Sequence, residues 1–133
     1  MYRIFCMIVS FVVLLMASCH SKDTNDPEKM AALTAKTYYE YLAGGKCEAW
    51  VDGFYRPDSI PASYREQLVA NAHMYVGQIR EAHKGLVSVG IAGAKVDTAQ
   101  HVGHVFLVLN FADSVKEEIV VPMVLSGGNW YMR

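Results

Sequence analysis

The apolar positions of the chain recur with two different periods, and the change falls at Gly85. Before Gly85, apolar residues lie three and four positions apart, the spacing of helices that bury one face. After Gly85 they alternate with a period of two, which is typical of β-strands. A block of helices followed by a block of strands indicates an α+β domain.

Two helices are predicted in the first part of this block. The first begins at Asp26-Pro27, because an aspartate suits the N-cap and a proline suits the first helical position. It ends at Gly44-Gly45, since glycine favours the backbone that terminates a helix. The second helix is indicated by an apolar stripe at helical spacing, formed by Cys47, Trp50, Val51, Phe54 and Tyr55.

A third helix is predicted after a loop that contains two prolines. It begins near Ala62 or Ser63, because Ser63 and Glu66 have the spacing of a capping box. It ends at Gly85. Its inner face is predicted to consist of Tyr64, Leu68, Ala72, Tyr75, Ile79 and Ala82.

Four strands are predicted after Gly85, over residues 86–96, 102–111, 116–125 and 130–133. The loops between them are short, which favours an antiparallel meander. In the second strand one face carries Val105, Leu107, Leu109 and Phe111, and the other carries Val102, His104, Phe106 and Val108. Antiparallel sheets usually leave one polar face to water. We therefore expect helices on one face, and a cavity, a second copy or an envelope protein on the other.

The first residues of the chain have the composition of a bacterial secretory signal. Arg3 precedes an apolar run over residues 4–16, and Ala17-Ser18 supply the small residues of a cleavage site. The run is shorter than the roughly 20 apolar residues that a spanning helix needs.

Cys19 follows this small pair directly and resembles the lipobox cysteine of bacterial lipoproteins. The chain departs from that pattern at Met16, where family members usually carry leucine. The resemblance implies a signal peptide over 1–18, a lipidated Cys19 at the start of a tether over 19–25, and a domain over 26–133. It also implies a membrane-anchored protein of a Gram-negative-type envelope, on the periplasmic or surface side. Ordinary secretory cleavage after Ala17 or Ser18 is the alternative.

Charge and cysteine content narrow the function classes. Twelve basic and thirteen acidic residues do not give the basic excess of a nucleic-acid-binding domain. Of the three cysteines, Cys6 is lost with the signal and Cys19 carries lipid, so Cys47 is left without a partner in the mature chain. On an apolar helical stripe it is interpreted as a small buried hydrophobe, with a reactive thiol as the alternative.

The order of three helices and a four-stranded meander resembles the nuclear-transport-factor-two-like superfamily, in which a curved sheet wraps around a long helix as a cone. Two segments are similar to small lipoproteins of this group: Tyr38-Tyr39-Glu40-Tyr41-Leu42-Ala43-Gly44, and Gly128-Asn129-Trp130-Tyr131-Met132. The superfamily includes enzymes, ligand binders and dimerisation modules, so the resemblance implies a scaffold and fixes no activity.

The function predicted from these features is a non-catalytic binding or assembly module for a small apolar ligand, a peptide or a protein partner. Its pocket is predicted to be lined by Tyr39, Trp50, Phe54, His104 and Tyr131. The alternative is an isomerase-type or dehydratase-type enzyme in which His104 acts as the base, with Tyr39, Tyr55 or Asp52 as its partner.

No cofactor and no metal are expected. His101 and His104 are the nearest pair of possible ligands in the strand region, but a spacing of three on a strand directs side chains to opposite faces.

Overall fold

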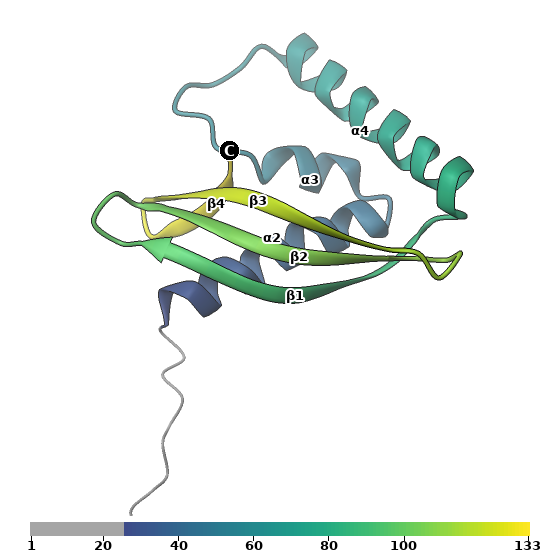
Figure 1. The fold of residues 1–133 in the computed structure, drawn as a ribbon. Helices are drawn as coiled ribbons and strands as arrows, with labels where there is room; N and C mark the ends of the chain where they lie inside the picture. Colours follow the sequence, from purple (N-terminus) through teal and green to yellow (C-terminus); the bar gives the residue numbers. More distant parts are fainter. Residues whose placement is uncertain (1–25) are drawn as a thin grey trace, which may run out of the picture.

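The computed structural model of the chain describes residues 26–133. The predicted signal peptide (1–18), the lipid attachment at Cys19 and the tether (19–25) lie outside the described residues. Three helices precede four strands in the described part (Figure 1): α2 (Pro27–Ala43), α3 (Cys47–Asp52), α4 (Ala62–His83), β1 (Leu86–Asp97), β2 (Val102–Phe111), β3 (Lys116–Ser126) and β4 (Asn129–Met132).

The strands form one sheet in the order β1-β2-β3-β4, and each pair is antiparallel. This is the meander that the short loops predict. β4 is short and pairs with Met123–Ser126 at the end of β3. Figure 1 shows α2 behind the sheet, α3 above the sheet and α4 above α3. None of the helices in residues 26–133 combines the length and apolarity that crossing a membrane requires.

Helix α2 begins and ends where the sequence indicates. Asp26 is the N-cap and accepts a hydrogen bond from the Glu28 amide at 3.1 Å, and Pro27 occupies the first turn. At the other end the Gly44 amide donates to the Glu40 carbonyl at 2.9 Å.

Helix α3 is shorter than its apolar stripe. It ends at Asp52 because Gly53 takes the C-cap. Phe54 instead forms a parallel bridge with Met132, and the Tyr55 amide donates to the Met132 carbonyl at 2.6 Å. The last two positions of the stripe therefore belong to a connection that crosses to β4.

The predicted capping box at the start of α4 is wrong. Pro61 occupies the N-cap position, no side chain caps the helix, and Ser63 lies inside the first turn. Proline ahead of the helix has a fixed extended backbone, which starts the helix without a side-chain hydrogen bond. The helix ends at His83, and Lys84 takes the left-handed conformation with φ 65°.

The core lies between α2 and the face of the sheet that carries Val105, Leu107 and Leu109, all of them 1 % exposed or less. α4 contributes little to this core, because only Ala72 and Ile79 of its residues are buried. The predicted inner face of α4 is thus partly wrong. Tyr64 and Tyr75 remain 52 % and 41 % exposed.

Candidate functional site: a cleft between helices α3 and α4

A cleft of about 640 Å³ opens between α3 and α4. We call it the α3–α4 cleft. Helix α3 contributes Trp50 and Val51, residues 54–60 form one side, and α4 contributes Tyr64, Leu68, Asn71, Ala72 and Tyr75. The volume lies within the range of small-molecule sites, which are mostly apolar with a few polar groups.

The cleft exists because α4 packs beside α3 and is held away from the sheet. The connection between the two helices contains Pro57 and Pro61 and forms no helix or strand beyond Phe54. Proline cannot donate a backbone hydrogen bond and restricts the residue before it to extended conformations. An extended segment of this kind keeps the start of α4 at a distance from α3. The side chains of Tyr64 and Tyr75 on α4 therefore border the cleft.

Three aromatic rings support the α3 side of the cleft. The rings of Tyr39 and Trp50 are 4.6 Å apart and nearly perpendicular at 80°, and those of Trp50 and Phe54 are 5.2 Å apart at 88°. Perpendicular edge-to-face contacts are favoured between aromatic rings. Tyr39, on α2, packs against Trp50 without lining the cleft. Burial raises the pKa of Tyr39 to about 12, so its hydroxyl keeps its proton at neutral pH.

Polar groups occur at two places near the cleft. Arg56 lines it and donates from Nη1 to the Val51 carbonyl at 3.0 Å, and Asp58 lines it as well. Outside it, Arg65 of α4 donates twice to Asp52 of α3, at 3.0 and 2.8 Å. These hydrogen bonds lower the pKa of Asp52 and raise that of Arg65. The two-pronged ion pair joins the helices that form the cleft.

The structure brings together part of the predicted pocket. Trp50 and Phe54 line the α3–α4 cleft, and Tyr39 packs behind Trp50. Tyr131 lies on β4 and contacts Tyr55, with ring centroids 6.1 Å apart.

His104 is separated from the other predicted pocket residues. It is exposed on β2, between Lys95 and Pro122 of the neighbouring strands, and it does not line the cleft. The sequence-based prediction that His104 shares a pocket with Trp50 and Phe54 is therefore corrected, because His104 does not line the cleft that contains them. The even-numbered residues of β2 face away from the buried odd-numbered ones, which is the reason for the separation.

The residues of α4 were missed as pocket residues because helical spacing assigned them to the core. Tyr64, Leu68 and Tyr75 share one face of α4, and that face borders the cleft. The sequence carries one signal of this position, since Gln67, Asn71 and Gln78 make α4 more polar than a helix buried in a core.

Cys47 is buried at 2 % exposure, as its place on the apolar stripe predicts. Its Sγ lies 3.4 Å from His73 Nδ1 of α4, and burial raises the pKa of the thiol. Across residues 26–133, no group of three or more His, Cys, Asp or Glu side chains is placed to hold a metal ion.

No protein-family model and no curated protein matches this sequence. Two solved structures have a similar fold. One is a Campylobacter jejuni protein described as an NTF2-like transpeptidase, 11 % identical, with a TM-score of 0.54 over 74 % of this chain and 92 % of that one. The other is a SEC-C motif containing protein from Rhodopseudomonas palustris, 12 % identical, with a TM-score of 0.51 over 74 % of this chain and 71 % of that one. At these identities the likeness concerns the fold alone, and it confirms that the chain has an α+β fold with an NTF2-like structural neighbour.

Proposed function

We propose that this protein is a lipid-anchored binding module of a bacterial cell envelope, which holds a small apolar ligand in the α3–α4 cleft without catalysis. The observation that carries the proposal is the cleft itself, about 640 Å³ in volume and bordered by aromatic side chains from two helices. The NTF2-like fold is compatible with such a role, because folds of this kind act as scaffolds for grafted sites.

The lining of the cleft indicates the class of ligand. Tyr64 and Tyr75 are about half exposed, and covering apolar surface contributes roughly 25 cal/mol per Å². Arg56 and Asp58 supply polar groups to the same cleft. A ligand with an apolar body and one polar end, comparable to a short fatty acid or an aromatic acid, fits this distribution.

The two tryptophans make binding measurable. Trp50 lines the cleft, whereas Trp130 is buried on β4 beside Gly103. In a Trp130→Phe chain, the fluorescence of Trp50 is expected to change on titration with the neutral apolar probe N-phenyl-1-naphthylamine. Competition with decanoic acid, decanol and decylamine then identifies the polar end that the cleft prefers.

A matched pair of variants tests the place of binding. Leu68→Asp introduces a charge into the cleft and is expected to weaken probe binding at least tenfold, a loss of about 1.4 kcal/mol. Leu33→Asp makes the same change on α2, where Leu33 is 44 % exposed and does not line the cleft, and is expected to leave binding unchanged. Equal affinity of both variants for the probe would contradict the proposed site.

The membrane anchor is tested separately. Two acyl chains anchor a protein stably, whereas one binds reversibly, so Cys19→Ser is expected to move the protein into the soluble fraction. Cys6→Ser is the control, because Cys6 belongs to the part of the chain that is removed with the signal. A Cys19→Ser protein that stays in the membrane fraction would show that the lipobox interpretation is wrong.

A further inference from the structure

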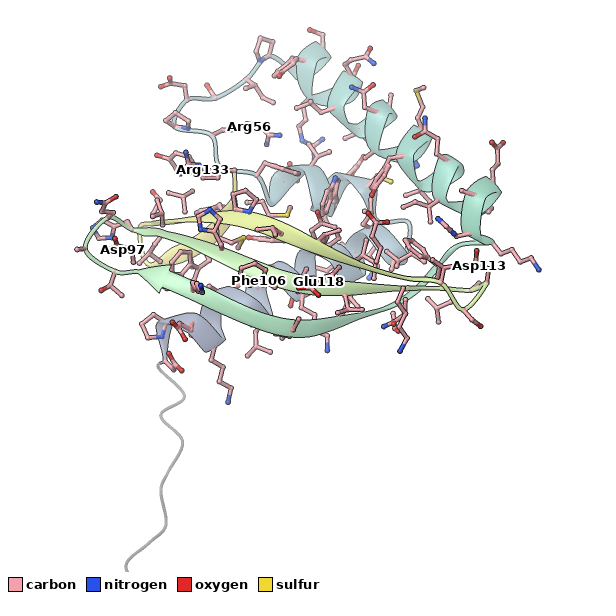
Figure 2. All side chains as sticks on the ribbon, viewed as in Figure 1. Arg56, Asp97, Phe106, Asp113, Glu118 and Arg133 are labelled. Atoms are coloured by element: carbon pink, nitrogen blue, oxygen red, sulfur yellow. The ribbon has the colours of Figure 1, made fainter. Side chains whose placement is uncertain are left out.

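A half-buried arginine, Arg56, lies in the wall of the α3–α4 cleft. It belongs to the connection between the two helices. The backbone beside it is fixed, because the Tyr55 amide donates to the Met132 carbonyl of β4 at 2.6 Å. Figure 2 shows Arg56 near the end of β4, at the opposite end of the molecule from Asp113. The arginine therefore marks one end of the cleft.

The fold holds the Arg56 guanidinium on one side and leaves its other side free. Nη1 donates to the Val51 carbonyl at the end of α3, at 3.0 Å. A guanidinium carries five N–H donors, and within residues 26–133 no hydrogen bond reaches the edge formed by Nε and Nη2. Such an edge matches the two oxygens of a carboxylate. Arg56 is thus oriented by the protein and keeps two parallel donors for a ligand.

The charge of Arg56 also lacks a direct partner. No carboxylate in the described part of the chain forms an ion pair with it. Both oxygens of Asp52 are taken by Arg65, and the pKa of the Asp52 carboxyl is lowered chiefly by this hydrogen bonding and less by the charge of Arg56. Because a charge that is partly removed from water is costly without a partner, a negatively charged group that enters the cleft is favoured at Arg56.

The apolar lining extends away from Arg56 along α4. The connection leads into the start of this helix, so Tyr64 lies at the Arg56 end of the cleft and Tyr75 lies farther along (Figure 1). The two tyrosines are eleven positions apart, which is about 16 Å at a helical rise of about 1.5 Å per residue. Leu68 and Ala72 line the cleft between them. An elongated apolar chain can therefore lie along α4 with its charged end at Arg56.

We propose that the ligand of the α3–α4 cleft is a fatty acid of medium chain length, and that Arg56 is the residue that selects its carboxylate. The carboxylate accepts two hydrogen bonds from Nε and Nη2 of Arg56, and the alkyl chain lies beside α4 towards Tyr75. Hydrogen bonds between two charged groups are roughly twice as strong as those between neutral groups. This inference rests on the proposed function, and it adds the charge of the ligand, its direction in the cleft and the residue that sets the preference.

The other charged group of the lining would favour a ligand of the opposite charge. Asp58 borders the cleft, but it is exposed, and in residues 26–133 no hydrogen bond holds its side chain. Pairs between exposed charges contribute little. Arg56 is half-buried and oriented by the Val51 carbonyl. A carboxylate is therefore favoured over an amine.

Three competitors with the same alkyl chain test the preference. Decanoate, decanol and decylamine displace N-phenyl-1-naphthylamine from the Trp130→Phe chain at neutral pH, where their head groups are negative, neutral and positive. We expect decanoate to bind about tenfold more tightly than decanol, as a hydrogen-bonded charge pair allows. Decylamine is expected to bind more weakly than decanol.

Substitution of Arg56 tests the residue. Arg56→Gln is expected to bring decanoate to the affinity of decanol and to leave the affinity for decanol unchanged, which also shows that the cleft is intact. Arg56→Lys keeps the charge without the planar fork, and its preference is expected to lie between those of the native chain and Arg56→Gln. Arg80→Gln is the matched control: Arg80 is an exposed arginine of α4 outside the cleft, so the tenfold preference is expected to persist.

The outcomes separate this inference from the proposed function. Equal affinities for decanoate and decanol would overturn the role of Arg56 but leave apolar ligand binding in place, because both compounds would still displace the probe. A preference for decylamine would overturn it as well and would identify Asp58 as the selecting residue. If Arg56→Gln weakened decanol as much as decanoate, Arg56 would only shape the cleft, and the inference would be wrong. A chain that binds neither the probe nor the competitors would overturn both proposals.

Discussion

His83 Nδ1 lies 2.9 Å from Asp113 Oδ2, and this contact fastens the end of α4 to the turn between β2 and β3. The imidazole also stacks on Phe111, with ring centroids 4.3 Å apart and planes inclined by 17°. The Asp113 amide donates to the His83 carbonyl at 3.2 Å. Since the rest of α4 borders an open cleft, these contacts position one end of the helix that forms it.

The His83–Asp113 contact is expected to make stability depend on pH in the acid range. The hydrogen bond from His83 holds the pKa of the Asp113 carboxyl below its ordinary value of about 3.9. A lowered folded-state pKa stabilises the protein above the unfolded pKa, and this contribution is lost as the pH falls through the folded value. Asp113→Asn is therefore expected to lower the free energy of unfolding near pH 7, and the difference from the native chain is expected to shrink towards about pH 3.

Urea unfolding at the two pH values measures this difference. Glu66→Gln, at an exposed carboxylate on α4, controls for the loss of one negative charge. A deficit of Asp113→Asn that is the same at both pH values would mean that the Asp113 charge does not stabilise the fold.

Replacement by alanine is expected to change the free energy of unfolding in opposite directions at Gly53 and Gly77. A Cβ at Gly53 would lie 2.6 Å from Tyr38 Cδ1, and the Tyr38 ring is held because its hydroxyl donates to the Trp130 carbonyl at 3.0 Å. Gly53→Ala is expected to lower the free energy of unfolding by about 1–3 kcal/mol through overpacking. Gly77 lies inside α4 with no atom within 4 Å of the added Cβ, so Gly77→Ala is expected to raise it by about 0.5–1 kcal/mol.

Urea unfolding of both variants at neutral pH tests this pair. The two changes add the same methyl group, so they differ only in the surroundings of the glycine. If Gly53→Ala were as stable as the native chain, the Tyr38 ring would have room to move, and its hydrogen bond to Trp130 would not fix it.

The element boundaries follow from local signals in the sequence, and this explains why they were predictable. Pro27 and Gly44 define α2, and alternation in β2 separates the buried Val105 and Leu107 from the outward Phe106. Each of these signals acts within a few residues. The mistaken capping box shows the limit of such reasoning. Pro61 occupies the N-cap of α4, so the helix begins one residue before Ser63 and the Ser63 side chain does not cap it.

The candidate site was predictable only in part, because it depends on how distant elements pack. Trp50 and Phe54 were identified from their aromatic character, and both line the cleft. The contributions of Tyr64 and Tyr75 depend on how far α4 lies from α3, which no periodic pattern encodes. His104 was misplaced because apolar sequence neighbours on a strand belong to the opposite face.

Tyr39 is expected to titrate later than an ordinary tyrosine. Burial raises its pKa to about 12, so a Tyr39→Phe chain is expected to lose the last step in the absorbance titration at 295 nm. A raised folded-state pKa means that its contribution to stability is fully present below about pH 10 and is lost as the pH rises through the folded value. The native chain is therefore expected to lose stability between about pH 10 and 12 faster than Tyr39→Phe. Loss of an early step in Tyr39→Phe, in place of the last one, would contradict the burial of this hydroxyl.

The buried Cys47 thiol is expected to be unreactive in the folded protein. The thiolate is the reactive form of cysteine, and Cys47 combines 2 % exposure with a raised pKa. In a chain carrying Cys6→Ser and Cys19→Ser, Cys47 is the remaining thiol, so labelling with Ellman's reagent reports on it alone. We expect slow labelling in native buffer and rapid labelling in concentrated urea. The variant His73→Ala distinguishes inert packing of the thiol from activation by the imidazole. If the imidazole activated the thiol, its removal would slow the labelling of Cys47 further. We expect His73→Ala to label at least as fast as its parent, since removing the ring uncovers the sulfur, and slower labelling would instead identify a functional thiol–imidazole pair.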